Sequence, residues 1–140
     1  MFKSQLADYR ILKVTLTKSI FELPHSSYQP KGDLKLGLHR NNNVELKDKQ
    51  FTVPLNVKVL EKESGFKMEV TMLGHFEVLT EDTQELDFKS FCNVNAPAII
   101  YPYVRQHVRN LSLEAGFNKP IILPIVNFVK FAESAEQSSD

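Results

Sequence analysis

The chain has 140 residues, of which 42% are hydrophobic and 24% charged, and its 17 basic residues are balanced by 17 acidic ones. This length predicts one ordinary domain over residues 1–140, and the balanced charge gives no electrostatic case for binding nucleic acid or an anionic membrane. The single cysteine, Cys92, cannot form an internal disulfide, which fits a reducing compartment. The N-terminus lacks the apolar run of a signal peptide and no stretch approaches a transmembrane helix, so we expect a cytoplasmic protein.

Four stretches with a period of two predict strands that each bury one face. The apolar positions are Leu12, Val14 and Leu16 in the first stretch, Leu34, Leu36 and Leu38 in the second, Phe51 to Val59 in the third, and Phe66 to Val78 in the fourth. Pro54 cannot donate to a strand ladder, so it indicates an edge position or a bulge in the third strand. The short turns favour an antiparallel sheet, and residues 25–32 fit a long crossover loop.

The rest of the chain, from Glu81 onward, predicts helices. The acidic segment from Glu81 to Asp87 favours a short helix over about residues 82–92. A long helix is expected from Asn95, a candidate cap, to Gly116, although Pro102 lies too deep for a first turn and should kink the helix or displace its start. A final helix is predicted near residues 127–136, and the ends, 1–7 and 137–140, are expected to be flexible. Strands followed by helices predict an α+β fold, with a four-stranded antiparallel sheet and helices packed on one face.

No group of residues points to catalysis. The five glycines form no phosphate-binding loop, and the histidines (His25, His39, His75 and His107) have no metal-like spacing. A nucleophilic pair of Cys92 with a histidine has no supporting local sequence, and a semi-buried thiol that acts as a small hydrophobe is the favoured interpretation. We therefore predict no enzymatic activity, no cofactor and no metal site.

A composite motif runs from Asn95 to Phe128. It comprises a Pro-aliphatic-aromatic-Pro-Tyr helix start, an arginine two residues later, a Gly-Phe helix end and a Pro-Val-Asn-Phe-like segment. In this chain the residues are Pro97, Ile99, Ile100, Tyr101, Pro102, Tyr103, Arg105, Gly116, Phe117, Pro124, Ile125, Val126, Asn127 and Phe128, with Ile125 as a one-residue insertion. The motif closely resembles the signature of the SecB family of protein-export chaperones.

This resemblance implies an ATP-independent holdase that forms a homotetramer, a dimer of dimers, through sheet and helix contacts. Hydrophobic grooves would bind unfolded or precursor proteins, keep them competent for export and deliver them to SecA. The implied client-binding residues are Tyr28, Phe66 and Phe128, and the soft side chains Met68 and Met72 suit the same promiscuous surface. The residues implied for a SecA-like partner are Glu22 and Glu69, and surplus apolar surface predicts an oligomer interface at Tyr101, Tyr103 and His107.

The family pattern is incomplete at the positions implied for SecA binding. Ser19 stands where an aspartate is usual and Lys67 where a leucine is usual, and the chain is neutral whereas the family is commonly acidic. The alternatives are therefore a SecB-like chaperone of a dedicated partner, such as an antitoxin, and an adaptor subunit without general chaperone activity. A small-molecule enzyme or binding module on the same fold has no convergent polar residues to support it.

Overall fold

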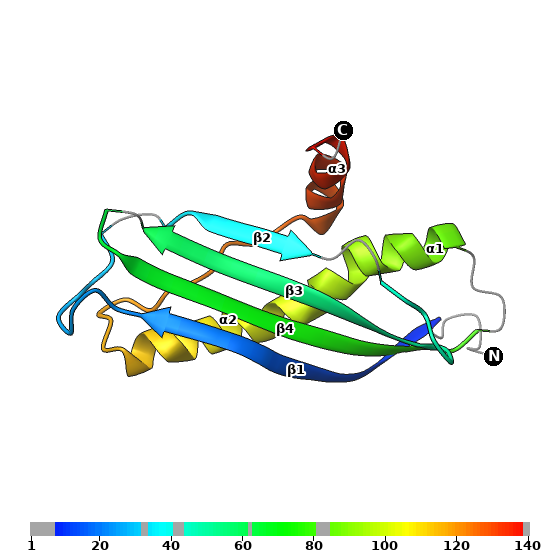
Figure 1. Ribbon diagram of the computed structural model, residues 1–140, viewed down its shortest axis with the longest axis horizontal. Helices are drawn as coiled ribbons and strands as arrows, with labels where there is room; N and C mark the ends of the chain where they lie inside the picture. Colours follow the sequence, from blue (N-terminus) through cyan, green and yellow to red (C-terminus); the bar gives the residue numbers. More distant parts are fainter. Residues whose placement is uncertain (1–7, 32–33, 41–43, 62, 81–84, 139–140) are drawn as a thin grey trace.

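The protein folds as one antiparallel sheet backed by a long helix (Figure 1). The computed structural model describes residues 8–31, 34–40, 44–61, 63–80 and 85–138. The strands are β1 (Tyr9–Glu22), β2 (Leu36–Arg40), β3 (Gln50–Glu61) and β4 (Phe66–Val78), in the order β1-β4-β3-β2. The helices are α1 (Glu85–Ser90), the π-helical turn η2 (Phe91–Asn95), α2 (Ala96–Glu114) and α3 (Phe128–Ser138).

The core lies between the sheet and α2, which confirms the predicted α+β fold with a helix on one face. Alternate residues of the two central strands point toward α2 and are buried: Phe51, Val53, Leu55, Val57 and Val59 from β3, and Phe66, Met68, Val70, Met72, Phe76 and Val78 from β4. The helix contributes Ile100, Val104 and Val108, none of which has any exposed surface. The four-residue spacing of these side chains forms the apolar stripe that holds α2 on the sheet.

The side chain of Ile100 in α2 packs tightly against the sheet at Gly74. A Cβ built on Gly74 would lie 2.8 Å from Cδ1 and 2.9 Å from Cγ1 of Ile100, and 2.7 Å from Cε2 of Phe76. Only a residue without a side chain leaves room there for Ile100. Gly74 therefore sets the distance between α2 and the sheet.

Two bulges in β1 change the predicted alternation of that strand. Its register with β4 shifts between Ile11 and Lys13 and again between Leu16 and Lys18. Val14 and Leu16 face the helix side as predicted, but Leu12 is the extra residue of the first bulge, so its assignment to that face was wrong. A bulge adds one residue to one strand and so breaks the period of two.

Four local predictions concern Pro54, Asn95, Pro102 and the short helix. Pro54 lies in β3, a central strand, and pairs with Leu73 of β4 without a register shift. The strand tolerates this proline because the last described pair between β2 and β3 is Arg40 with Leu55, and Pro54 lies beyond that pair. Asn95 has helical dihedrals and no capping hydrogen bond, since η2 leads directly into α2. Pro102 lies inside α2 and does not displace its start, and the alternative of a kink stays a prediction. The short helix is predicted at about 82–92; residues 82–84 lie outside the described part, and residues 85–92 are helical in α1 and η2.

Candidate functional site

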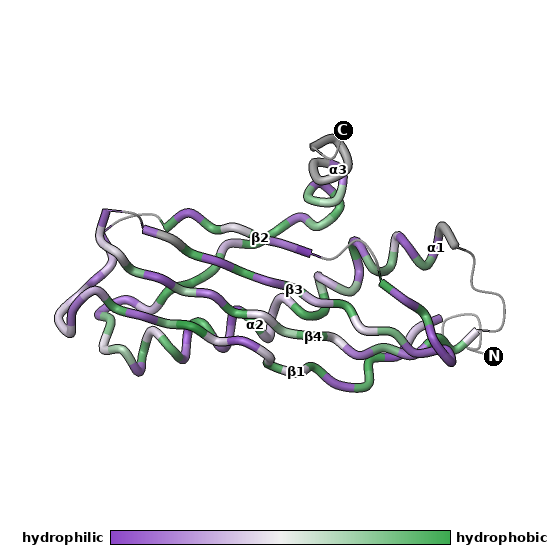
Figure 2. The backbone as a smooth tube through the Cα atoms, in the orientation of Figure 1, coloured by the Kyte–Doolittle hydropathy of each residue, from purple (hydrophilic) through white to green (hydrophobic). Residues whose placement is uncertain are grey.

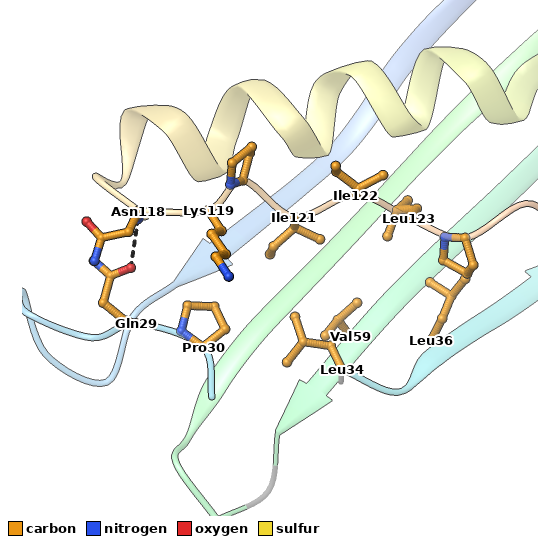
Figure 3. A pocket seen from close by; sticks show the side chains of 12 residues that line it. Gln29, Pro30, Leu34, Leu36, Val59, Asn118, Lys119, Ile121, Ile122 and Leu123 are labelled. Atoms are coloured by element: carbon orange, nitrogen blue, oxygen red, sulfur yellow. Dashed lines mark hydrogen bonds between the residues drawn. The ribbon is translucent and has the colours of Figure 1, made fainter. Parts of the chain in front are cut away.

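A groove of about 790 Å³ lies between the crossover loop, β2 and the segment that joins α2 to α3 (Figure 3). Its twelve lining residues are Gln29, Pro30, Leu34, Leu36, Val59, Asn118, Lys119, Pro120, Ile121, Ile122, Leu123 and Pro124. Most of them are aliphatic or proline, and Lys119 is the only charged one. The volume falls within the range of about 300–1,000 Å³ that is typical of binding pockets.

The joining segment forms one wall, and α2 holds it in place. Ser112, which has no exposed surface, donates a hydrogen bond to the Arg109 carbonyl (2.8 Å) and accepts one from the Ile121 amide (2.9 Å). The Tyr101 hydroxyl donates to the Pro124 carbonyl at 2.5 Å. Pro120 and Pro124 lack N–H groups, so this extended wall needs few partners of its own.

The side chain of Gln29 closes one end of the groove. Its amide nitrogen donates to the Gly116 carbonyl (3.0 Å), and its amide oxygen accepts from the Asn118 backbone N–H (2.9 Å), as the dashed line in Figure 3 shows. The two bonds tie the crossover loop to the end of α2. This link joins residues that are far apart in the sequence, and no local sequence pattern predicts it.

The five residues predicted to bind clients lie in the core. The exposed fractions are 6% for Tyr28, 0% for Phe66, 1% for Met68, 6% for Met72 and 6% for Phe128, and none of the five lines the groove. The Tyr28 ring stacks on Phe66 at 5.2 Å between centroids, and its hydroxyl donates to the Glu61 carboxylate. Burial and the Glu61 hydrogen bond raise the pKa of Tyr28. The accessible apolar site is therefore the groove beside these residues, and direct contact with them would require the core to open.

The three residues predicted for an oligomer interface have different surroundings. Tyr101 is 4% exposed and packs edge-on against Phe128, so its ring belongs to the core of this chain. His107 is half-buried, with Nε2 at 2.8 Å from the Ser19 hydroxyl of β1. Tyr103 is 52% exposed and stays available for contact with another chain.

Other apolar side chains of β1 and α2 are exposed as well. Ile11 and Leu16, on the helix side of β1, are 38% and 44% exposed, and Ile99 and Leu113 of α2 are 38% and 49% exposed. Figure 2 shows hydrophobic and hydrophilic segments interleaved along β1. A 14-residue edge strand with exposed apolar side chains is a surface that proteins normally cover.

The two carboxylates predicted for a SecA-like partner lie on the sheet face opposite α2. Glu22 is exposed and pairs in register with Lys67. Glu69 accepts a hydrogen bond from Asn56 (2.8 Å) and lies 3.2 Å from Nζ of Lys18, and these contacts hold its pKa below the ordinary value. Ser19 pairs with Val70 and so lies on the helix side, away from both carboxylates.

Within the described ranges, nothing resembles a catalytic centre. Burial raises the pKa of Cys92 to about 12, which leaves the thiol protonated and unreactive near neutral pH. The same ranges contain no cluster of three or more His, Cys, Asp or Glu side chains arranged to hold a metal ion. No described helix combines the length and the apolar character needed to cross a membrane.

Comparisons with known proteins define the class of this chain, which is that of SecB-type chaperones. The family model described as preprotein translocase subunit SecB matches residues 10–139. The chain therefore belongs to the SecB family, whose members are chaperones and not enzymes.

Individual relatives agree with this assignment. The chain is 26% identical to the protein-export protein SecB of Magnetococcus marinus, over 96% of this chain and 88% of the relative, and 28% identical to that of Saccharophagus degradans, over 84% and 73%. A solved SecB-like chaperone from Mycobacterium tuberculosis, in complex with a peptide from an antitoxin, shares the fold with a TM-score of 0.66. It has 16% sequence identity, and the match covers 85% of this chain and 91% of that one.

Sequence reasoning missed the aliphatic walls of the groove. Leu34 and Leu36 were predicted only as strand residues, and Ile121, Ile122 and Leu123 only as an apolar connection between helices. One signal was available, because prolines on both sides of an apolar run keep it out of a helix and in an extended form. Ile122 is 70% exposed, which is unusual for a side chain that serves only the core.

Proposed function

We propose that the groove binds extended, apolar segments of non-native polypeptides and holds them without nucleotide, in the cytoplasm. The observation that supports this proposal is the aliphatic groove itself, whose wall exposes Ile122 in the isolated chain. Of the described residues that line the groove, only Lys119 is charged, and nine of the twelve are aliphatic or proline. The groove favours apolar side chains of many shapes.

The size of the groove implies weak binding at one site. A client segment that buries about 400 Å² of apolar area gains roughly 10 kcal/mol at ~25 cal/mol/Å². The loss of rigid-body freedom and the ordering of the client cost about 4–15 kcal/mol, which offsets most of that gain. Tight holding therefore requires that one long client occupies several grooves at once.

Self-association would supply those grooves. We propose that copies associate through the β1 edge and the exposed face of α2, where Tyr103, Ile99 and Leu113 lie, and that the assembly is the predicted homotetramer. Light scattering of the purified protein tests this proposal. A monomer at all concentrations would contradict it.

Paired substitutions in the joining segment test the groove. Ile122 lines the groove, whereas Ile125 is 90% exposed and does not line it. We expect Ile122→Glu to weaken binding of a labelled, chemically unfolded protein roughly tenfold, because a carboxylate would enter an apolar site, and Ile125→Glu to leave it nearly unchanged. Fluorescence anisotropy without ATP measures both affinities, and equal effects of the two changes would contradict the proposal.

A dedicated client is the second candidate, and the shared fold with a SecB-like chaperone that holds an antitoxin peptide favours it. A general holdase would bind several unrelated unfolded proteins with similar affinity and stop their aggregation, whereas a dedicated chaperone would bind one partner far more tightly. Export would add delivery to SecA, with Glu22 and Glu69 as proposed contacts. Loss of SecA binding in a Glu22→Lys variant would support delivery.

A further inference from the structure

The sheet face opposite α2, called the open face below, carries an excess of positive charge. Alternate residues of β1, β4 and β3 form it, and in Figure 1 the described helices lie behind it or beyond its edge. Its basic side chains in the described strands are Arg10, Lys13, Lys18, Lys58 and Lys67, and its acidic ones are Glu22, Glu69 and Glu77. The chain as a whole is balanced, so this excess is specific to the open face.

Most of the negative charge on the open face is already compensated. Arg10 forms an ion pair with Glu77. Glu69 is shared by two lysines, with Nζ of Lys18 at 3.2 Å and Nζ of Lys58 at 3.8 Å. Two cations on one carboxylate leave positive charge that a further anion can use.

Lys13 and Lys67 are the other two cations of the open face. Both are exposed, and neither forms an ion pair with another described residue. Lys13 pairs in register with His75. Burial and the positive charge of Lys13 lower the pKa of His75, so His75 adds no positive charge near neutral pH. Their positions along β4 differ by eight residues, which is about 26 Å at ~3.3 Å per residue.

Apolar side chains lie between these charges. Pro54 and Leu73 are cross-strand partners and half-buried, and Ile20, opposite Glu69, is 37% exposed. Leu73 and Ile20 therefore offer apolar contacts between Lys13 and Lys67, on either side of the cluster of Lys18, Lys58 and Glu69. Lys13 and Lys67 lie about 26 Å apart along the face, which suits the separated carboxylates of a polypeptide better than the continuous negative charge of a nucleic acid or an anionic membrane.

We propose that the open face docks an acidic, extended segment of a partner protein. Carboxylates of that segment pair with Lys13 and Lys67 at its two ends, and its apolar side chains contact Ile20 and Leu73. An extended segment of about nine residues spans both lysines. The open face is separate from the groove, so this proposal stands whether or not the groove binds clients.

The test uses the full chain and a labelled nine-residue peptide with glutamate at positions 1 and 9, valine at positions 3, 5 and 7 and serine at the others, so that the charged and apolar side chains of an extended peptide share one face. The same peptide carrying lysine for glutamate is the comparison. We expect only the glutamate peptide to bind, and binding to weaken strongly between about 0.1 M and 1 M salt, as the screening length falls from ~10 Å to ~3 Å. The double variant Lys13→Glu with Lys67→Glu should bind it about tenfold more weakly. Both lysines are exposed and neither forms an ion pair with another described residue, so the variant should keep its fold.

Two controls separate the open face from charge and from the groove. Lys31→Glu with Lys130→Glu makes the same charge change at exposed positions outside the open face and should leave peptide binding unchanged. Ile122→Glu, which alters the groove, should do the same. The double lysine variant should still bind an unfolded protein as the wild type does.

Other outcomes would overturn the proposal. Tighter binding of the lysine peptide would show that the open face selects a basic partner. Tighter binding of single-stranded DNA or of phosphatidylglycerol vesicles would assign it to a different class of ligand. Equal losses in the two double variants would mean that only net charge matters.

Discussion

Replacement of Gly74 by alanine tests how closely α2 packs on the sheet. The new methyl group would lie less than 3.0 Å from carbon atoms of Ile100 and Phe76, both of which are buried. These atoms belong to packed side chains that cannot move without displacing their neighbours. The strain must therefore be absorbed by a shift of α2 or by strained rotamers.

The expected cost follows from two opposing terms. Overpacking of a core by one methyl group costs about 1–3 kcal/mol. The loss of glycine flexibility from the unfolded chain offsets about 0.4–1 kcal/mol of that. We expect a net destabilisation of about 1–2 kcal/mol, which lowers the melting temperature by about 3–8 °C for a chain of this size.

Gly37 provides the matched control, because it is also a strand glycine but its added Cβ would meet nothing nearer than 3.7 Å. Gly37→Ala should be neutral or slightly stabilising. Urea unfolding and calorimetry at one fixed protein concentration measure both variants, since self-association would make the melting temperature depend on concentration. If Gly74→Ala were as stable as Gly37→Ala, the close packing of α2 at Gly74 would be refuted.

Three further predictions concern single side chains. Ser112→Ala leaves the Ile121 amide without its acceptor and should cost about 1–3 kcal/mol in urea unfolding, whereas alanine at the exposed Ser26 should cost little. Asn127 accepts a hydrogen bond from the Lys130 amide at 3.1 Å, so Asn127→Ala should destabilise α3 by about 1 kcal/mol and speed its hydrogen exchange, and Asn127→Ser should restore it. The pKa of His75 lies below its ordinary 6.5, so the unfolded chain binds the proton first and stability should fall as pH drops below about 6.5. His75→Gln should flatten that slope, while His39→Gln should keep it.

Each of these three predictions has an outcome that contradicts it. Ser112→Ala and Ser26→Ala with equal midpoints would show that water replaces the Ser112 hydroxyl. If the amides of α3 exchanged at the same rates in Asn127→Ala as in the wild type, Asn127 would not act as the cap of α3. If the stability of His75→Gln still fell as the pH dropped below about 6.5, another titratable group would cause the loss of stability. Protonation of Glu69 is distinguishable, because its pKa is lowered from 4.5 and its effect belongs to a more acidic range.

The parts of the fold that follow a simple period could be predicted from the sequence. β4 keeps its alternation from Phe66 to Val78 across Gly74, and α2 keeps its stripe through Pro102 because that proline lies on the exposed side. β1 could not be predicted fully, since bulges at Leu12 and Thr17 leave no mark in the composition.

The groove was beyond sequence reasoning for a different reason. Its walls, Leu34 with Leu36 and Ile121 with Ile122, come together only through the sheet order and the path of the joining segment. Aromatic residues such as Tyr28 and Phe66 suit a client site and a core equally well, and only tertiary packing decides between the two.

The bulges of β1 also determine how this strand tolerates a change in length. In a regular strand, a one-residue deletion turns every following side chain to the opposite face. In β1, Ile11 and Lys13 already pair with consecutive residues of β4, as do Leu16 and Lys18. Deletion of Leu12 or Thr17 would therefore leave an unbroken ladder with the remaining side chains facing as they do now, and a homologue one residue shorter there would keep both surfaces of the sheet.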